Sequence, residues 1–192
     1  MIHKARVFIS VVVLVFSISL FTSTVSFAGG KSALKEAQGK MYYTAVNIWY
    51  EEPDKIPSTN YHKGQIIPVN TPVVIGSVRK SCITFTDSNK VKYSIEIVSK
   101  HTPIPLEDLF RHYFSASMTD LKLFTSDERA NIENGTIAVG MSKEAVVVAY
   151  GYPPAHMTPS LDRSPWKYWK DRFRNFLVYF NSDAKVSRMG DD

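Results

Sequence analysis

The sequence predicts an α+β protein built from two small domains, a β-rich domain over residues 40–117 and an α+β domain over residues 118–192. Between residues 41 and 97, short apolar runs alternate with turn residues roughly every eight to ten positions, which is typical of a small barrel or sandwich. After residue 118, helical patterns come first and three short aromatic strands follow. We therefore expect a small β-barrel ahead of helices packed on a three-stranded antiparallel sheet.

Residues 1–28 have the three parts of a signal peptide. Lys4 and Arg6 form the positive end, residues 7–21 are almost entirely apolar, and Ser26 and Ala28 put small side chains before the cut. We expect cleavage after Ala28 and release into the periplasm without lipid attachment, because no cysteine lies near the cut. The alternative is an uncleaved N-terminal anchor, for which the apolar run is short. No transmembrane span is expected after signal cleavage.

The composition fits a folded, mildly basic protein. Of the 192 residues, 44% are hydrophobic and 21% are charged, and the formal net charge is +5. These values argue against disorder. The single cysteine, Cys82, excludes an intramolecular disulfide framework and any metal site built from several thiolates.

The first domain is expected to begin after a polar leader over residues 29–39. In residues 42–50, both sets of alternating positions contain apolar as well as polar residues. This pattern predicts a strand that is covered on both faces. Residues 51–64 contain several breakers and form a long loop. Ile83 and Phe85 alternate with polar residues and should point inward. Further strands are expected at 66–67, 73–78, 83–86 and 91–98.

A helix over residues 106–113 closes the first domain. Its apolar stripe, with the spacing of one helix face, consists of Leu106, Leu109, Phe110 and Tyr113. Pro103 and Pro105 fit the first turn, where a missing N–H is harmless. The small and polar residues 115–119 that follow are the best candidate for the domain boundary.

The second domain is expected to start with a helix over residues 121–133 and a turn at 134–135. Ser142 can cap a second helix, and Gly151, followed by two prolines, ends it. Residues 146–148 would equally suit a buried strand, but the cap and stop signals favour a helix.

A proline-rich loop over residues 152–165 leads to a three-strand meander. The expected strands are 166–169, 176–180 and 185–188. Phe176, Val178 and Phe180 alternate along the middle strand and should face the helix.

Four elements in this region resemble the small outer-membrane assembly lipoproteins of the SmpA/OmlA (BamE-like) family. They are the helix opening Gly-Met-Ser-Lys-Glu at 140–144, the stop Tyr-Gly-Tyr-Pro at 150–153, Trp-Lys-Tyr at 166–168 and Val-Tyr-Phe at 178–180, with Val186 in the last strand. The resemblance implies an α+β domain that serves protein and lipid contacts in envelope assembly. This chain has no lipobox cysteine and has an additional N-terminal half, which favours a BamE-like module in another periplasmic protein.

Residues 64–97 resemble a bacterial SH3-like barrel, chiefly through Gly-Gln-Ile-Ile-Pro at 64–68 and Thr-Pro-Val-Val-Ile at 71–75. The resemblance implies that the β-rich domain, with the helix at its end, is SH3-like.

The titratable residues give no pattern for catalysis or for a metal or cofactor. The histidines after residue 28 are not spaced three or four residues apart, so no helical metal pair is expected; they are His62, His101, His112 and His156. His112 follows Asp108 by four residues on the expected helix and should form a surface pair with it. Cys82 lies in a strand and should be a packed or half-buried thiol, although a Cys–His pair formed in space stays open.

The C-terminal sheet, rich in cations and aromatic residues, is the region that points to function. Export makes nucleic acid an improbable ligand, which leaves an envelope protein or an anionic lipid or peptidoglycan surface as the partner. Trp166 and Tyr168 should pack inward, while Trp169, Arg172 and the loop over 152–156 should be exposed. The expected partner-binding residues are Tyr152, His156, Trp169, Arg172 and Arg174.

These observations favour a non-catalytic scaffold or binding protein of the periplasmic cell envelope, such as one acting in outer-membrane assembly or maintenance. Two alternatives stay open: an envelope enzyme such as a Cys82-dependent peptidase, and a secreted hydrolase inhibitor. The competing interpretation of the cationic sheet is that its aromatic side chains fill the core while its cations are merely solvated.

Overall fold

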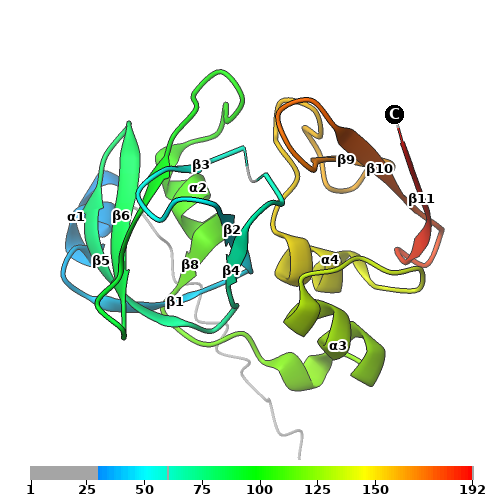
Figure 1. Ribbon diagram of the computed structural model, residues 1–192, viewed down its shortest axis with the longest axis horizontal. Helices are drawn as coiled ribbons and strands as arrows, with labels where there is room; N and C mark the ends of the chain where they lie inside the picture. Colours follow the sequence, from blue (N-terminus) through cyan, green and yellow to red (C-terminus); the bar gives the residue numbers. More distant parts are fainter. Residues whose placement is uncertain (1–29, 60, 192) are drawn as a thin grey trace, which may run out of the picture.

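The computed structural model describes residues 30–59 and 61–191, and the expected signal peptide lies outside them. The fold is α+β, with a curled β-sheet and several helices, as predicted. Figure 1 shows the larger sheet on one side of the molecule and a three-stranded sheet on the other. Within the described residues, no helix is both long enough and apolar enough to cross a membrane. Below, residues 30–117 are called the first half and residues 118–191 the second half.

The first half contains a six-stranded sheet with the strand order β3-β7-β6-β5-β1-β8. All neighbours are antiparallel except β3 and β7, which are parallel. Ile83 and Phe85 of β6 are completely buried, which confirms the predicted inward face. The strands are β1 (Met41–Thr44), β3 (Ile56–Pro57), β5 (Pro72–Val78), β6 (Cys82–Asp87), β7 (Lys92–Glu96) and β8 (Phe114–Ser115).

Two sequence predictions for this half are wrong. The segment predicted to be a polar leader contains helix α1 (Gly30–Ala37), because Leu34 and Ala37 lie three residues apart and pack into the core. The single strand predicted over 42–50 is divided into β1 and β2 (Ile48–Tyr50), and β2 pairs with β4 (Gln65–Ile67) in a separate two-stranded sheet.

Helix α2 (Leu106–Tyr113) has the bounds that the sequence predicts, and its buried residues belong to the predicted stripe. The chain then returns to the sheet, because β8 pairs with β1. Ser115, the first residue of the predicted boundary, is therefore still part of the first sheet, and the exposed residues follow it.

The second half contains two helices and a three-stranded antiparallel sheet with the order β11-β10-β9. This sheet confirms the predicted meander. The elements are the 3-10 helix η1 (Leu121–Leu123), α3 (Ser126–Asn134), α4 (Lys143–Tyr150), β9 (Trp166–Trp169), β10 (Asn175–Phe180) and β11 (Val186–Asp191).

The ends of the two helices follow from local chemistry. Ser142 accepts a hydrogen bond from the Ala145 N–H at the start of α4, and Gly151 ends this helix, as predicted. At α3, Thr125 and Glu128 form a reciprocal capping box that the sequence analysis did not identify. Burial disfavours the Glu128 carboxylate, but hydrogen bonds donated by Ser142 and Thr125 outweigh this effect and lower its pKa to about 2.

Helix α4 packs on the three-stranded sheet. Trp166 and Tyr168 of β9 are completely buried beneath it, and Phe176 and Val178 of β10 face the same core, which confirms the predicted inward side. The alternate residues of the three strands therefore face away from α4.

The two halves are joined by specific polar contacts. Asn47, buried between β1 and β2, donates to the carbonyl oxygens of Ile132 (2.6 Å) and Ala149 (3.0 Å) and accepts from the Val69 N–H (2.8 Å). We call this region of contact between the halves the joint. The division into two domains near residue 118 stays a prediction.

Candidate binding surface

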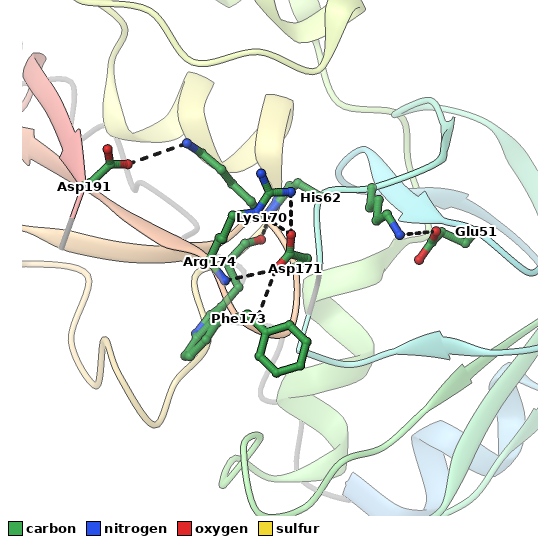
Figure 2. Close-up of polar contacts among 9 residues, drawn as sticks. Glu51, His62, Lys170, Asp171, Phe173, Arg174 and Asp191 are labelled. Atoms are coloured by element: carbon green, nitrogen blue, oxygen red, sulfur yellow. Dashed lines mark hydrogen bonds and ion pairs between the residues drawn. The ribbon is translucent and has the colours of Figure 1, made fainter.

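The tip of the β9–β10 hairpin is a turn held by one carboxylate. Asp171 accepts hydrogen bonds from the backbone N–H groups of Phe173 (2.9 Å) and Arg174 (3.0 Å) and from the Arg174 Nε (2.7 Å), as Figure 2 shows. The Phe173 hydrogen bond and the Arg174 contacts hold the pKa of Asp171 below its ordinary value. The turn is consequently well defined although it projects into solvent.

Phe173 is the most exposed large apolar residue in the described part of the chain, with 84% of its surface accessible. It stands between two exposed arginines, and the Arg172 guanidinium lies 5.6 Å from the centre of its ring. An aromatic ring that a defined turn holds in water is a common feature of contact surfaces. The sequence pattern includes Phe173 among the aromatic residues of the cationic sheet, but does not distinguish it from the others as a partner-binding residue.

Lys170 extends the positive charge of the turn toward the end of the sheet. Its Nζ lies 5.4 Å from the centre of the Phe176 ring. The same atom lies 3.7 Å from the exposed carboxylate of Asp191 (Figure 2). The latter contact is long and solvated, so it holds Lys170 weakly. Lys170, Arg172, Phe173 and Arg174 are called the hairpin tip from here on.

The face of the sheet that points away from α4 also carries cations and aromatic rings. On it, Tyr179 of β10 lies opposite Arg188 of β11, and the Arg188 guanidinium stacks 3.4 Å from the centre of the Tyr179 ring. Lys167 of β9 is opposite Leu177 of β10. Cations and apolar side chains thus alternate across strands, so part of the predicted solvated charge is stacked on aromatic rings.

Trp169 is not the exposed residue that the sequence predicts. Its ring is half-buried, and its indole N–H is buried with no hydrogen-bond partner within the described residues. Its carbonyl oxygen lies 2.9 Å from the Nδ1 of His62, in the first half. Trp169 therefore belongs to the base of the hairpin and to the joint rather than to the tip.

Tyr152 and His156 do not lie on the same surface as Arg172 and Arg174. Tyr152 stacks on His112, and His156 contacts His101, so both face the first half. The loop that begins at Tyr152 was predicted to be exposed, but two of its prolines are buried; they are Pro153 and Pro154. Of the five expected partner-binding residues, the structure places only the two arginines at the hairpin tip.

The remaining candidates for chemistry are arranged as follows. The Cys82 thiol is half-buried and lies 4.0 Å from the Ser81 hydroxyl. The predicted surface pair of His112 with Asp108 is wrong, because Asp108 pairs with Arg111 and His112 turns toward Tyr152. Residues 30–59 and 61–191 contain no group of three or more side chains placed to hold a metal ion.

An open groove of about 590 Å³ lies beside the base of the hairpin. Its apolar lining comes from both halves, with Lys170 and Asp191 at its edge. The apolar lining residues include Trp49, Tyr150, Phe176 and Met189.

No family model, no curated protein and no solved structure matches this chain.

Proposed function

We propose that this protein is a non-catalytic binding protein of the bacterial cell envelope and that the hairpin tip contacts an anionic partner. The observation that carries the proposal is the exposure of Phe173 between Arg172 and Arg174 on a turn that Asp171 holds. Burying this ring against a partner would remove apolar surface from water, and the defined turn reduces the entropy lost on binding.

Anionic lipid headgroups are the partner that best fits these residue types. Each lysine or arginine close to an anionic surface contributes roughly 1 kcal/mol of attraction. An aromatic ring at the level of the headgroups adds apolar contact without crossing the membrane. Peptidoglycan and an acidic face of an envelope protein offer the same charge but a less apolar environment for Phe173.

The sequence supports an envelope location. The signal peptide expected at residues 1–28 would deliver the protein to the periplasm. The sequence near the cut contains no cysteine to which a lipid could be attached. Mass spectrometry of the protein from a bacterial host should find Gly29 at the amino terminus. An intact Met1 or a lipid adduct would contradict this location.

The finer fold assignment belongs to the same proposal. We infer that the second half is a BamE-like module and the first half an SH3-like domain, acting in outer-membrane assembly or maintenance. Two helices followed by an antiparallel three-stranded meander support the first inference, and the curled sheet supports the second. A BamE-like module would fit protein and lipid contacts of the kind described above.

Vesicle sedimentation tests the lipid contact. The protein should sediment with phosphatidylcholine vesicles that contain phosphatidylglycerol and much less with phosphatidylcholine alone, and added salt should release it. Phe173→Ala and Arg172→Gln should each weaken sedimentation several-fold. Leu123→Ala is the matched control, because Leu123 is 82% exposed but lies away from the hairpin, in η1.

Two results would contradict the proposal. Equal binding to neutral and anionic vesicles would show that the arginines do not attract anionic headgroups. Binding by Phe173→Ala as strong as that of the wild type would remove the role of the hairpin tip.

A further inference from the structure

All four histidines after the expected signal peptide lie at the joint, although no two of them are close in the sequence. His62, His101 and His112 belong to the first half, and each contacts the second half, from which His156 comes. Histidine is the side chain whose charge ordinarily changes in mildly acidic solution. Because the histidines gather at the contact between the two halves, this contact should respond to acid.

His112 is held flat against a tyrosine of the other half. Its ring and the Tyr152 ring are 3.6 Å apart between centroids and inclined by only 5°. The two rings line a small cavity of about 30 Å³, together with Ser58, Thr102 and Pro153. This volume has room for about one or two water molecules and not for a hydrated charge.

The charged groups beside His112 come from its own helix. Asp108 and Arg111 pair with each other, and Tyr152 is the titratable group that faces the ring from the second half. Burial lowers the pKa of His112 from 6.5 to about 4; Asp108 opposes this shift and Arg111 adds to it. The His112 ring that stacks on Tyr152 is therefore neutral.

His101 and His156 form a pair across the joint. Their ring centroids are 4.6 Å apart, and the Nδ1 of His156 lies 2.9 Å from the carbonyl oxygen of His101. The two rings therefore contact each other directly across the joint. Burial, together with the charge of His101, lowers the pKa of His156, while the hydrogen bond to His101 opposes the shift.

His62 differs from the other three, because both of its ring nitrogens face carbonyl oxygens. Nδ1 is 2.9 Å from the oxygen of Trp169 and Nε2 is 2.6 Å from that of Tyr150, so only the doubly protonated ring donates to both. Burial lowers its pKa to about 4 even so. Tyr150 stacks on the ring and Tyr168 meets it edge to face. By its lowered pKa His62 adds to the acid response of the joint, although its two carbonyl contacts can hold a protonated ring in the closed form.

We propose that the joint is acid-sensitive, and that proton uptake by His112 and His156 separates the two halves. Since these rings bind protons more readily when the joint is open, acid favours the open form. The contribution of the neutral His112 ring to the stability of the closed form is complete above about pH 6.5. It is lost as the pH falls toward about 4. Each such histidine changes the opening equilibrium by up to about tenfold per pH unit.

Energy transfer between two dyes tests this inference. The dyes are attached at Lys80→Cys and Asp183→Cys, which are exposed turn positions of the two halves, in a Cys82→Ser background. Transfer should fall as the pH is lowered from about 7.5 to about 4.5. In His112→Phe with His156→Gln, which keeps a stacked ring and an amide donor, the transition should move to lower pH and become shallower.

Tyr152→Phe is the matched control, because it keeps the stacked ring and all four histidines and should open at the wild-type pH. If the double variant does not close at neutral pH, His156→Gln alone provides the comparison. Opening of these variants at the same pH as the wild type would overturn the proposal. So would a wild-type joint that stays closed to about pH 4.5.

Discussion

The side chain of Asn47 donates a hydrogen bond of 2.6 Å to the carbonyl oxygen of Ile132, which lies 85 residues further along the chain. Because the same amide also donates to the last turn of α4 and accepts from Val69, one buried residue satisfies backbone groups of three separate segments. The joint is therefore a specific polar contact and not only a place where two apolar surfaces meet.

Asn47→Ala should lower the free energy of unfolding by about 3 kcal/mol. The substitution leaves buried carbonyl oxygens without a donor, which costs more than the hydrogen bonds themselves contribute. Urea denaturation followed by circular dichroism measures the change. Asn134→Ala, at an exposed position of α3, is the control and should change stability little; equal effects of the two substitutions would contradict the role given to Asn47.

Gly135→Ala should also destabilise the joint, by roughly 2–3 kcal/mol. Gly135 has a φ of 62°, and a Cβ there would lie 2.5 Å from the Cδ1 of Ile66 and 2.8 Å from the Cζ2 of Trp49. Gly39→Ala separates backbone strain from this clash, since Gly39 also has a positive φ but has no atom within 4 Å of such a Cβ. Thermal melting of both variants should show the larger loss for Gly135; equal losses would mean that the clash is relieved.

Glu128→Gln should remove a pH dependence of stability that is distinct from that of the histidines. The pKa of Glu128 in the folded protein is about 2, below its ordinary 4.5, so the carboxylate stabilises the fold above about pH 4.5 and loses this effect as the pH falls toward 2. Unfolding of the wild type and Glu128→Gln should differ by about 1–3 kcal/mol at neutral pH and converge in strong acid. A constant difference over this pH range would contradict the assignment.

Arg172→Ala should affect vesicle binding, whereas Trp169→Ala should affect the stability of the fold. Arg172 is exposed at the hairpin tip, so its loss should weaken vesicle binding and leave the melting temperature unchanged. Trp169 is half-buried at the joint, so its loss should lower stability by roughly 2–4 kcal/mol. Measuring both quantities for each variant decides between a contact surface and a solvated face. Unchanged binding by Arg172→Ala would favour the latter.

Limited proteolysis should cut first within residues 116–118, because exposed residues such as Met118 follow β8 there, or within the exposed segment 51–55 that precedes β3. Thr119 ends the accessible stretch, since Asn70 binds both its N–H and its carbonyl oxygen. The two fragments should elute together at neutral pH, because the joint holds them. First cuts within residues 73–98 would contradict both the domain boundary and the barrel interpretation.

Local sequence patterns determined most of the elements. The alternation around Phe85, the stripe of α2, the cap at Ser142 and the stop at Gly151 each depend on residues within a few positions of one another. Such patterns are visible in the sequence because backbone geometry repeats over two or about 3.6 residues. The α+β class and the order of the last three strands follow from them.

Only the tertiary structure decided which side chains are buried by contacts between distant elements. Leu34 and Ala37 form a helix because a core covers them. Trp169 is half-buried at the joint, where His62 of the other half binds its carbonyl oxygen. The four histidines carry no local pattern, and the exposure of Phe173, in contrast to the buried Phe176 nearby, is visible only in the structure. Burial at the joint depends on contacts between residues up to 107 positions apart, and this separation is why no window of the sequence could reveal it.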